Sequence, residues 1–418
     1  MGTGGSSEGD HDMDAQDTAG ARIATFRRLR GMSQRELAQK AAISLSLLSK
    51  VETGNRPATP AVISATAREL KIDIAQITGQ PFAPDTPTDA QVHEHVAVLR
   101  RELAAYNLPP TAEGQPRSIE DLTADVAKLA NLRHGVNLLK LGEHLPKTLE
   151  ALRFAAHAYE GSIREQVYGL LAEGYAAAGQ LAYKMGYIDL SALTTDRYEW
   201  AAERSGDPLC VHIGDYLRAG ELMMAGDTAS AAALMDASLG RLEPHLGGRG
   251  SNWQSKWAVW GNLHLKAALV AARSGRGDAE LSAWQYYEQA KTAADEIGED
   301  RDDYRLYFGP TNVRIWAVSL AVELCDDAGA IGKAEDVHLP SSAPSERRSH
   351  HWIDLARAHV WRNDPGNALQ CLYEARDIAP QHARFHPQVR ETAQQVARME
   401  RQTTGTLRSF ASWLGMND

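Results

Sequence analysis

From about residue 90 onward, apolar side chains recur at helical spacing in Ala-rich segments of about 12–20 residues. Short breaks such as GDP, AGD, SGRGD and NDPG separate these segments, and no long stretch alternates in the way that indicates a strand. Because a helix with one apolar face has to bury that face against another element, the pattern predicts an all-α body of packed helix pairs.

A weak internal repeat accompanies these helical segments. Weaker copies of its first half begin at Tyr168, Cys210, Trp257 and Ile315, and the clearest copy begins at Trp352. The intervals are 42, 47, 58 and 37 residues, and only the last approaches the period of about 34 residues typical of tetratricopeptide (TPR) repeats. The body therefore resembles an irregular TPR-like α-solenoid of about six helix pairs with a concave face. The clearest copy matches the TPR pattern at these positions: Trp352, Leu355, Ala356, His359, Ala368, Leu372, Ala375 and Pro380.

Residues 20–78 have a different organisation, with several short helices. Ser33 followed by Glu36 forms a capping box that starts a helix at about residue 34, and Ser44 caps the next helix, which stops at Gly54. Two short helices joined by a turn of about three residues predict a helix-turn-helix. The residues predicted to point inward are Leu37, Ile43, Leu48 and Val51, and those on the opposite face of the second helix are Leu45, Ser46, Ser49 and Lys50.

The charge distribution supports a separate function for this segment. Residues 20–80 carry ten Lys or Arg against four acids, whereas the whole chain has a net charge of −10. Residues 1–19 carry five acids and no Lys or Arg. A compact basic segment in an acidic chain is typical of a domain that binds a polyanion such as nucleic acid.

The stretch RGMSQRELAQKAAISLSLLSKVETGNRPAT resembles the Xre family of phage-repressor-like helix-turn-helix regulators. The matching features are S-Q-x-E-L-A, the I-S turn, L-S-K-x-E and G-x-R-P, over about 60 residues that include helices at 24–30 and 62–70. Ala42 departs from the family, which usually has Gly at this turn. The resemblance implies an Xre/lambda-repressor-like DNA-binding domain.

Position by position, the resemblance implies contacts with a double-stranded DNA operator. Gln34 would hold a phosphate, and we count the neighbouring Arg35 among the DNA-binding residues. Ser44 and either Asn55 or Arg56 would hold phosphates on both sides of the recognition helix. Facing the major groove would be Leu45, Ser46, Ser49 and Lys50. Because this set contacts bases weakly, we expect salt-dependent binding by a homodimer, whose two helix-turn-helix units meet half-sites about 34 Å apart.

The combination of an Xre-like domain and a TPR-like body resembles the RRNPP group of peptide-sensing regulators and the Xre–TPR regulators of actinomycetes. It implies dimerisation through the helical body and a peptide or small-molecule effector in its groove. Between the two parts, GQPFAPDTPTDA (79–90) has three prolines and is predicted to be a linker, which when extended reaches about 40 Å and separates domain 20–78 from domain 91–418. Residues 1–19 are predicted to be a disordered acidic tail and not a signal peptide.

Two places in the body are candidate ligand contacts. Trp253, Trp257 and Trp260 form a stripe at helical spacing, for which helix packing and a ligand-binding shelf are the alternatives. In GPTNVRIWAVSLAVEL (309–324), Thr311 or Asn312 is predicted to cap a helix. The alternative for Asn312 is that its amide holds a peptide backbone, and we count Asn312, Trp257 and Trp260 as ligand-binding candidates.

Other chemistry has little support in the sequence. His382 and His386 have i, i+4 spacing, but no acid or Cys completes a zinc set, so we expect no metal site and no cofactor. No nucleotide-binding, hydrolase or metalloprotease motif is present, which argues against an enzyme. The absence of a long apolar segment and three widely spaced cysteines predict a cytoplasmic protein that does not enter a membrane.

These observations predict a sequence-specific transcriptional regulator. The alternative is an interaction adaptor, in which the solenoid binds another protein and the helix-turn-helix only tethers it to DNA. A dry pocket on the concave face with polar and aromatic walls and with Asn312 in it would favour a small ligand or peptide, and a broad, shallow apolar patch would favour a protein partner.

Overall fold

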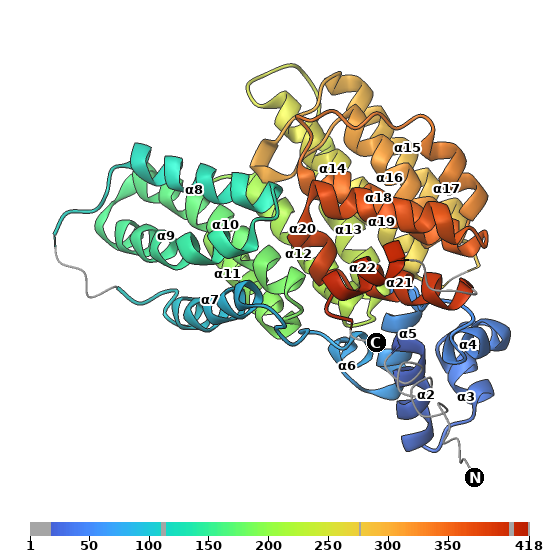
Figure 1. Cartoon of the computed structure of the whole chain (residues 1–418). Coiled ribbons are helices and arrows are strands. Elements are labelled where there is room, and N and C mark those ends of the chain that lie inside the picture. Colours follow the sequence, from blue (N-terminus) through green and yellow to red (C-terminus); the bar gives the residue numbers. More distant parts are fainter. Residues whose placement is uncertain (1–17, 110–113, 276, 401–404, 417–418) are drawn as a thin grey trace, which may run out of the picture.

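A computed structural model of the chain describes residues 18–109, 114–275, 277–400 and 405–416. Over these ranges the molecule is built from helices and contains no strand, only an isolated bridge between Arg301 and Phe308. The all-α prediction is confirmed: a small helix-turn-helix unit (the head, residues 18–79) sits against a large body of stacked helices (residues 87–416) (Figure 1). In the described part of the chain, no helix is long and apolar enough to cross a membrane.

The head encloses its own core, which contains Ile23, Leu37, Leu48 and Leu70 with almost no exposed surface. Its described helices are α2 (Ala19–Leu29), α3 (Gln34–Lys40), α4 (Leu45–Glu52), α5 (Pro60–Leu70) and α6 (Ile74–Thr78).

The head begins earlier than the sequence predicted. Thr18 caps α2 by accepting a hydrogen bond from the Ala21 N–H, and both Thr18 and Ala19 are buried. The predicted tail 1–19 is therefore two residues too long, because Thr18 and Ala19 belong to the folded head. Residues 1–17 of that tail lie outside the described residues.

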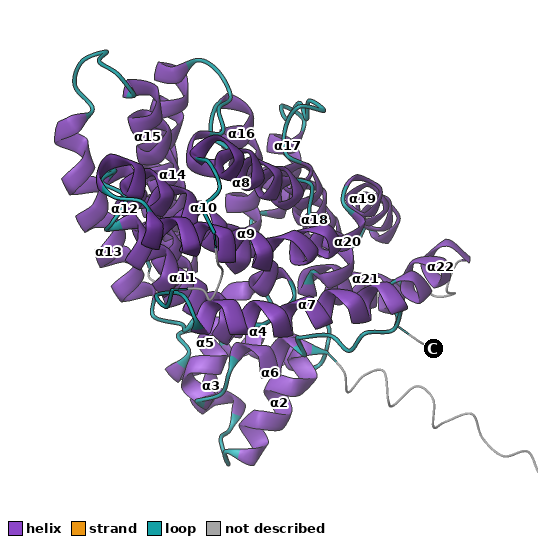
Figure 2. Cartoon of the chain, turned by 90° about the vertical axis from the view of Figure 1, so that its left-hand side faces the viewer, coloured by secondary structure: helices purple, strands orange, loops and turns teal. Residues whose placement is uncertain are grey.

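The body consists of helices that pack in consecutive pairs, and the pairs stack side by side (Figures 1 and 2). Six pairs follow one another from α8 to α19, after which α20, α21 and α22 cover the end of the stack. The helices are α7 (Pro87–Ala104), α8 (Ile119–His134), α9 (Leu138–Ala158), α10 (Gly161–Lys184), α11 (Ile188–Ala202), α12 (Pro208–Met224), α13 (Thr228–Leu242), α14 (Trp253–Arg273), α15 (Ala279–Ile297), α16 (Pro310–Glu323), α17 (Asp327–Ala334), α18 (Ser345–Trp361), α19 (Pro365–Ile378), α20 (Pro380–Phe385), α21 (Pro387–Met399) and α22 (Gly405–Trp413).

The weak sequence repeat corresponds to this pairing. Its five copies lie on α10, α12, α14, α16 and α18, each of which is the first helix of a pair. The intervals are irregular because the pairs differ in length: α14 and α15 have 21 and 19 residues, whereas α16 and α17 have 14 and 8. The body is a helical repeat-like stack, and its relation to TPR repeats stays a prediction.

The stretch LRSFASWLG packs on the end of the stack. Leu407, Phe410 and Leu414 are fully buried in a cluster shared with α18, α19 and α21. Trp413 is half-buried beside them.

The connection between head and body, residues 80–86, is shorter than the predicted linker. Pro87 occupies the first turn of α7, where its missing N–H costs no hydrogen bond, so residues 87–90 are helical. The connection also does not hold the head away from the body. Gln80 Nε2 donates to the Phe385 carbonyl (3.1 Å), and Arg384 pairs with Asp85 and with Asp89.

The head docks mainly on α21. The Ala19 N–H donates to Glu391 Oε1 (2.7 Å), Gln388 Nε2 donates to the Ala58 carbonyl (3.4 Å), and Arg398 Nη1 donates to the Gly54 carbonyl (3.1 Å). A further contact joins Arg68 of α5 to the Gly226 carbonyl between α12 and α13 (2.8 Å). Figure 2 shows the head helices below α7 and α21. The sequence predicts a linker that separates the two parts, whereas in this arrangement the head lies against the body.

Candidate nucleic-acid interface

The starts of the two helix-turn-helix helices form as the sequence predicts. Ser33 and Glu36 make the reciprocal capping box of α3, with Glu36 Oε2 accepting from the Ser33 N–H at 2.7 Å. The Ser44 hydroxyl accepts from the Leu47 N–H at 3.1 Å and caps α4. In the turn between them, Ala42 has φ +54°, the left-handed conformation in which glycine is favoured.

A buried carboxylate fixes the position of α4 relative to α2 and α3. Both oxygens of Glu52, at the end of α4, accept from Arg27 of α2 at 2.7 and 2.9 Å. The Gln34 side-chain amide of α3 donates to the same carboxylate at 2.7 Å. The hydrogen bond to Glu52 raises the pKa of Arg27 above its ordinary value. Gln34, predicted to hold a phosphate, therefore also has a structural partner in the head.

The two faces of α4 have the expected character. Leu48 and Val51 are buried, and Ile43 is half-buried against the same core. On the other face Leu45 is 41% exposed, Ser46 and Lys50 are exposed, and Ser49 is half-exposed. The four side chains predicted to face the major groove therefore share one accessible helix face, and their contacts with bases stay a prediction.

The predicted phosphate contacts are in different environments. Arg35 and Ser44 are exposed beside α4, and Asn55 is exposed with its amide donating to the Thr53 hydroxyl (2.9 Å). Arg56 instead lies against the body, with its guanidinium 5.1 Å from the centre of the Trp361 ring and its Nε buried. In this arrangement Arg56 is held by the body.

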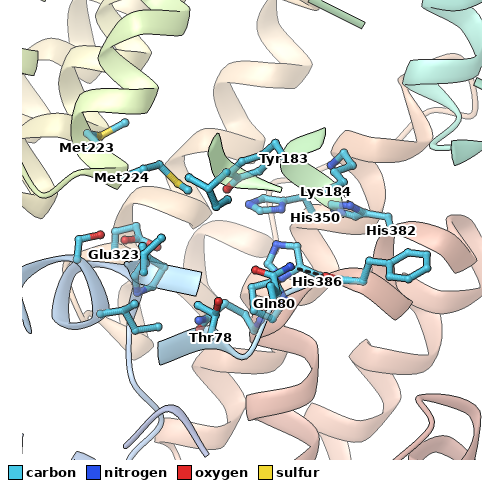
Figure 3. A pocket seen from close by; sticks show the side chains of 18 of the residues that line it. Thr78, Gln80, Tyr183, Lys184, Met223, Met224, Glu323, His350, His382 and His386 are labelled. Carbon is cyan, nitrogen blue, oxygen red and sulfur yellow. Dashed lines mark hydrogen bonds between the residues drawn. The ribbon is translucent and has the colours of Figure 1, made fainter. Parts of the chain in front are cut away.

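A cavity of about 150 Å³ lies between the head and the body, where α5 and α6 face the body helices. The head contributes Ile63, Ser64, Ile74 and Thr78, and the connection contributes Gln80. Figure 3 shows Tyr183, Met223, Met224 and three histidines of the body around the same space. This site escapes prediction from the sequence, because its walls come from ten helices and no local motif marks them. A second cavity, of about 380 Å³, lies between the connection, α21 and the C-terminal segment.

Buried charges in the wall of the first cavity are paired. Lys184 Nζ donates to Glu346 Oε1 at 3.1 Å. Burial lowers the pKa of Lys184; burial alone would raise the pKa of Glu346, but Lys184 and Arg347 hold it well below its ordinary value. Glu323 accepts from Arg273 (2.8 Å) and Arg357 (3.2 Å), and these cations lower its pKa to about 2 against the opposite effect of burial.

The residues that the sequence proposed as ligand contacts have packing roles. Trp260 is buried in the main core, Trp257 packs edge-on against it with ring centres 5.4 Å apart, and Trp253 is half-buried at the start of α14. Asn312 is fully buried and donates to the Tyr307 carbonyl (2.7 Å). Neither Asn312 nor Thr311 caps α16, whose N-cap is Gly309, so the capping prediction is wrong. Asn312, Trp257 and Trp260 line neither of the two cavities.

Comparison with known proteins places the head among DNA-binding domains. Residues 18–77 match the family model described as "Helix-turn-helix domain". An uncharacterized HTH-type transcriptional regulator of Bacillus subtilis (strain 168), YazB, is 37% identical over 65 residues, which are 16% of this chain and 87% of that protein. No solved structure matches the chain.

Proposed function

Because the chain belongs to the helix-turn-helix transcriptional regulators through its head, we propose that it is a sequence-specific regulator that inserts α4 into the major groove of an operator. The observation that carries this proposal is the accessible face of α4, where Leu45, Ser46, Ser49 and Lys50 lie together and the capped turn and Glu52 hold the helix in place. Lys can contact guanine O6 and N7, Ser contacts either base type, and Leu can pack on a thymine methyl.

We further propose that the body forms the dimer and senses a signal in the cavity behind the head. The four side chains on the accessible face of α4 are expected to contact bases only weakly. Useful specificity therefore needs two half-sites, which supports a homodimer. A cavity with polar and aromatic walls favours a small-molecule effector over the adaptor alternative, although it is formed by other residues than Asn312.

The docked position of the head suggests how the signal is transmitted. Arg56, one of the predicted phosphate contacts, is held at Trp361, and the cavity wall includes residues of both α5 and α6. An effector that fits the cavity in only one head position shifts the population between docked and released heads. Release makes Arg56 available to a phosphate.

The test is binding of purified chain to operators selected from genomic DNA. We expect Ser46→Ala with Lys50→Ala to reduce the ratio of specific to non-specific affinity by about 10-fold or more, because base contacts are worth about 1–3 kcal/mol. Lys71→Ala is the matched control, since it removes a positive charge from the end of α5, away from α4. An unchanged ratio in the double variant contradicts the proposed role of α4.

A second variant separates phosphate contacts from base contacts. Arg35→Ala should weaken binding to all sequences alike and reduce the slope of log affinity against log salt by about 1. A loss confined to one base pair of the operator contradicts the phosphate assignment.

A further inference from the structure

Three histidines from different parts of the chain meet in the wall of the first cavity. His350 lies on α18, His382 on α20, and His386 immediately before α21. Each offers one ring nitrogen, and these nitrogens all lie within 4.8 Å of one another. Figure 3 shows the three rings grouped beside Lys184 and Gln80. From the sequence alone only His382 and His386 are recognised as a pair, because His350 lies 32 residues before His382 on another helix.

The contacts of each ring identify the nitrogen that is available to a ligand. His350 Nε2 lies 3.6 Å from Asp354 Oδ2, and its Nδ1 is buried without a partner. His382 Nδ1 contacts Lys184 Nζ at 3.0 Å. The residue is only 3% exposed, and its Nε2 is buried without a hydrogen-bond partner. His386 Nδ1 accepts from the Gln388 N–H at 3.2 Å, which leaves Nε2.

Unpartnered buried nitrogens are unusual, because a buried polar atom without a hydrogen bond costs about 1–3 kcal/mol. Imidazole nitrogens without a hydrogen bond can bind a ligand that accepts their lone pairs, such as a metal ion.

We propose that His350, His382 and His386 together bind one divalent transition-metal ion of the zinc type, with a fourth position open to the cavity. Imidazole nitrogen suits Zn²⁺, Co²⁺, Ni²⁺ and Cu²⁺, and three protein ligands with one open position are typical of zinc sites that bind a further molecule. Asp354 beside His350 supplies the carboxylate that commonly orients a metal-bound imidazole.

Loading the site requires small rearrangements. Zn–N bonds of about 2.0–2.1 Å in a tetrahedron bring the nitrogens to about 3.3 Å from one another, so the rings close inward. With the metal on Nε2, His382 and His386 carry a proton on Nδ1. Lys184 turns away from His382 Nδ1 and keeps its ion pair with Glu346. His386 gives up its long hydrogen bond to Gln388.

The ion would join α18 to the α20–α21 junction, next to the point where Gln80 of the connection bonds to Phe385. The open position gives an effector in the cavity a direct ligand bond. This inference does not rest on the proposed function, because metal binding is measured without DNA. Failure of the DNA tests would therefore leave it standing, and its own failure would leave DNA binding standing.

The experiment titrates the untagged full chain with Co²⁺ followed by visible absorption, and with Zn²⁺ followed by calorimetry. We expect one ion per chain and the intense absorption of four-coordinate Co²⁺. His350→Gln and His386→Gln should each weaken binding by about 100-fold or more. His351→Gln is the matched control, because it removes a buried histidine next to His350 that lies outside the cluster, and it should bind as the unaltered chain does.

Circular dichroism checks that each variant is folded, and the spectrum of the unaltered chain decides the question if a variant is not. Absence of saturable binding, or the weak spectrum of six-coordinate Co²⁺, overturns the proposal. Equal affinity in His350→Gln, His386→Gln and the unaltered chain also overturns it.

Discussion

Ala42 illustrates how one residue departs from the local preference of its site. Its φ of +54° places it in the left-handed region, and its side chain is exposed, so no packing contact offsets the strain. A left-handed conformation costs an L-residue about 1–2 kcal/mol, whereas glycine adopts it freely. Glycine is usual at this position in the Xre family that the head resembles, and the left-handed conformation is the physical reason.

We predict that Ala42→Gly stabilises the chain by about 0.5–1 kcal/mol, because relief of strain exceeds the extra entropy lost on folding. Ala41→Gly is the control one residue earlier. Ala41 is buried and has φ −76°, so this substitution should destabilise by about 1 kcal/mol. Denaturant unfolding of both variants measures the difference, and destabilisation by Ala42→Gly contradicts the strained turn.

At the scale of elements, Glu323 connects three helices of the body. It lies at the end of α16 and accepts from Arg273 of α14 and Arg357 of α18. These hydrogen bonds cross between neighbouring helix pairs and line the cavity. Removing one partner of a buried ion pair is costly, because the remaining charge stays out of water.

The pKa of Glu323 predicts a pH dependence of stability. Because its pKa is lowered to about 2 in the folded chain, against about 4.5 when unfolded, the carboxylate stabilises the fold above pH about 4.5. That stabilisation, of the order of 3 kcal/mol, is lost as the pH falls from about 4.5 to about 2. We expect Glu323→Gln to be less stable than the unaltered chain at pH 7, with a difference that shrinks towards pH 3. A difference in unfolding free energy that is constant with pH argues against this assignment.

At the scale of the whole molecule, the head is held against the body by contacts from several residues. Contacts from Glu391, Gln388 and Arg398 on α21 hold it against the body, and Trp361 holds Arg56. If DNA binds only the released head, docked molecules are unavailable to DNA. The apparent affinity is then the intrinsic affinity multiplied by the fraction of molecules whose head is released.

Arg398→Ala should therefore bind DNA more tightly, by about 5-fold for each 1 kcal/mol of docking energy lost. The matched control is Arg362→Ala, a body arginine that pairs with Asp327 of α17. Anisotropy titrations of a fixed operator measure both variants. Equal or weaker affinity of Arg398→Ala indicates that the docked head already binds DNA.

The sequence by itself determined the local features of this protein. The caps at Ser33 and Ser44, the two faces of α4 and the first helix of five body pairs depend on interactions within a few residues, so spacing and residue type predict them. The tertiary structure decided how distant segments meet: the docking of the head on α21, the capture of Arg56 by Trp361 and the meeting of His350 with His382 and His386. Asn312 and Trp260 also show what a local pattern cannot distinguish. In the sequence, a polar or aromatic residue on a helix looks the same whether it faces a ligand or the core, and in the structure both residues are buried. Which neighbour covers a helix face depends on the packing angles of the whole stack, and these follow from the summed contacts of many side chains that no local pattern contains.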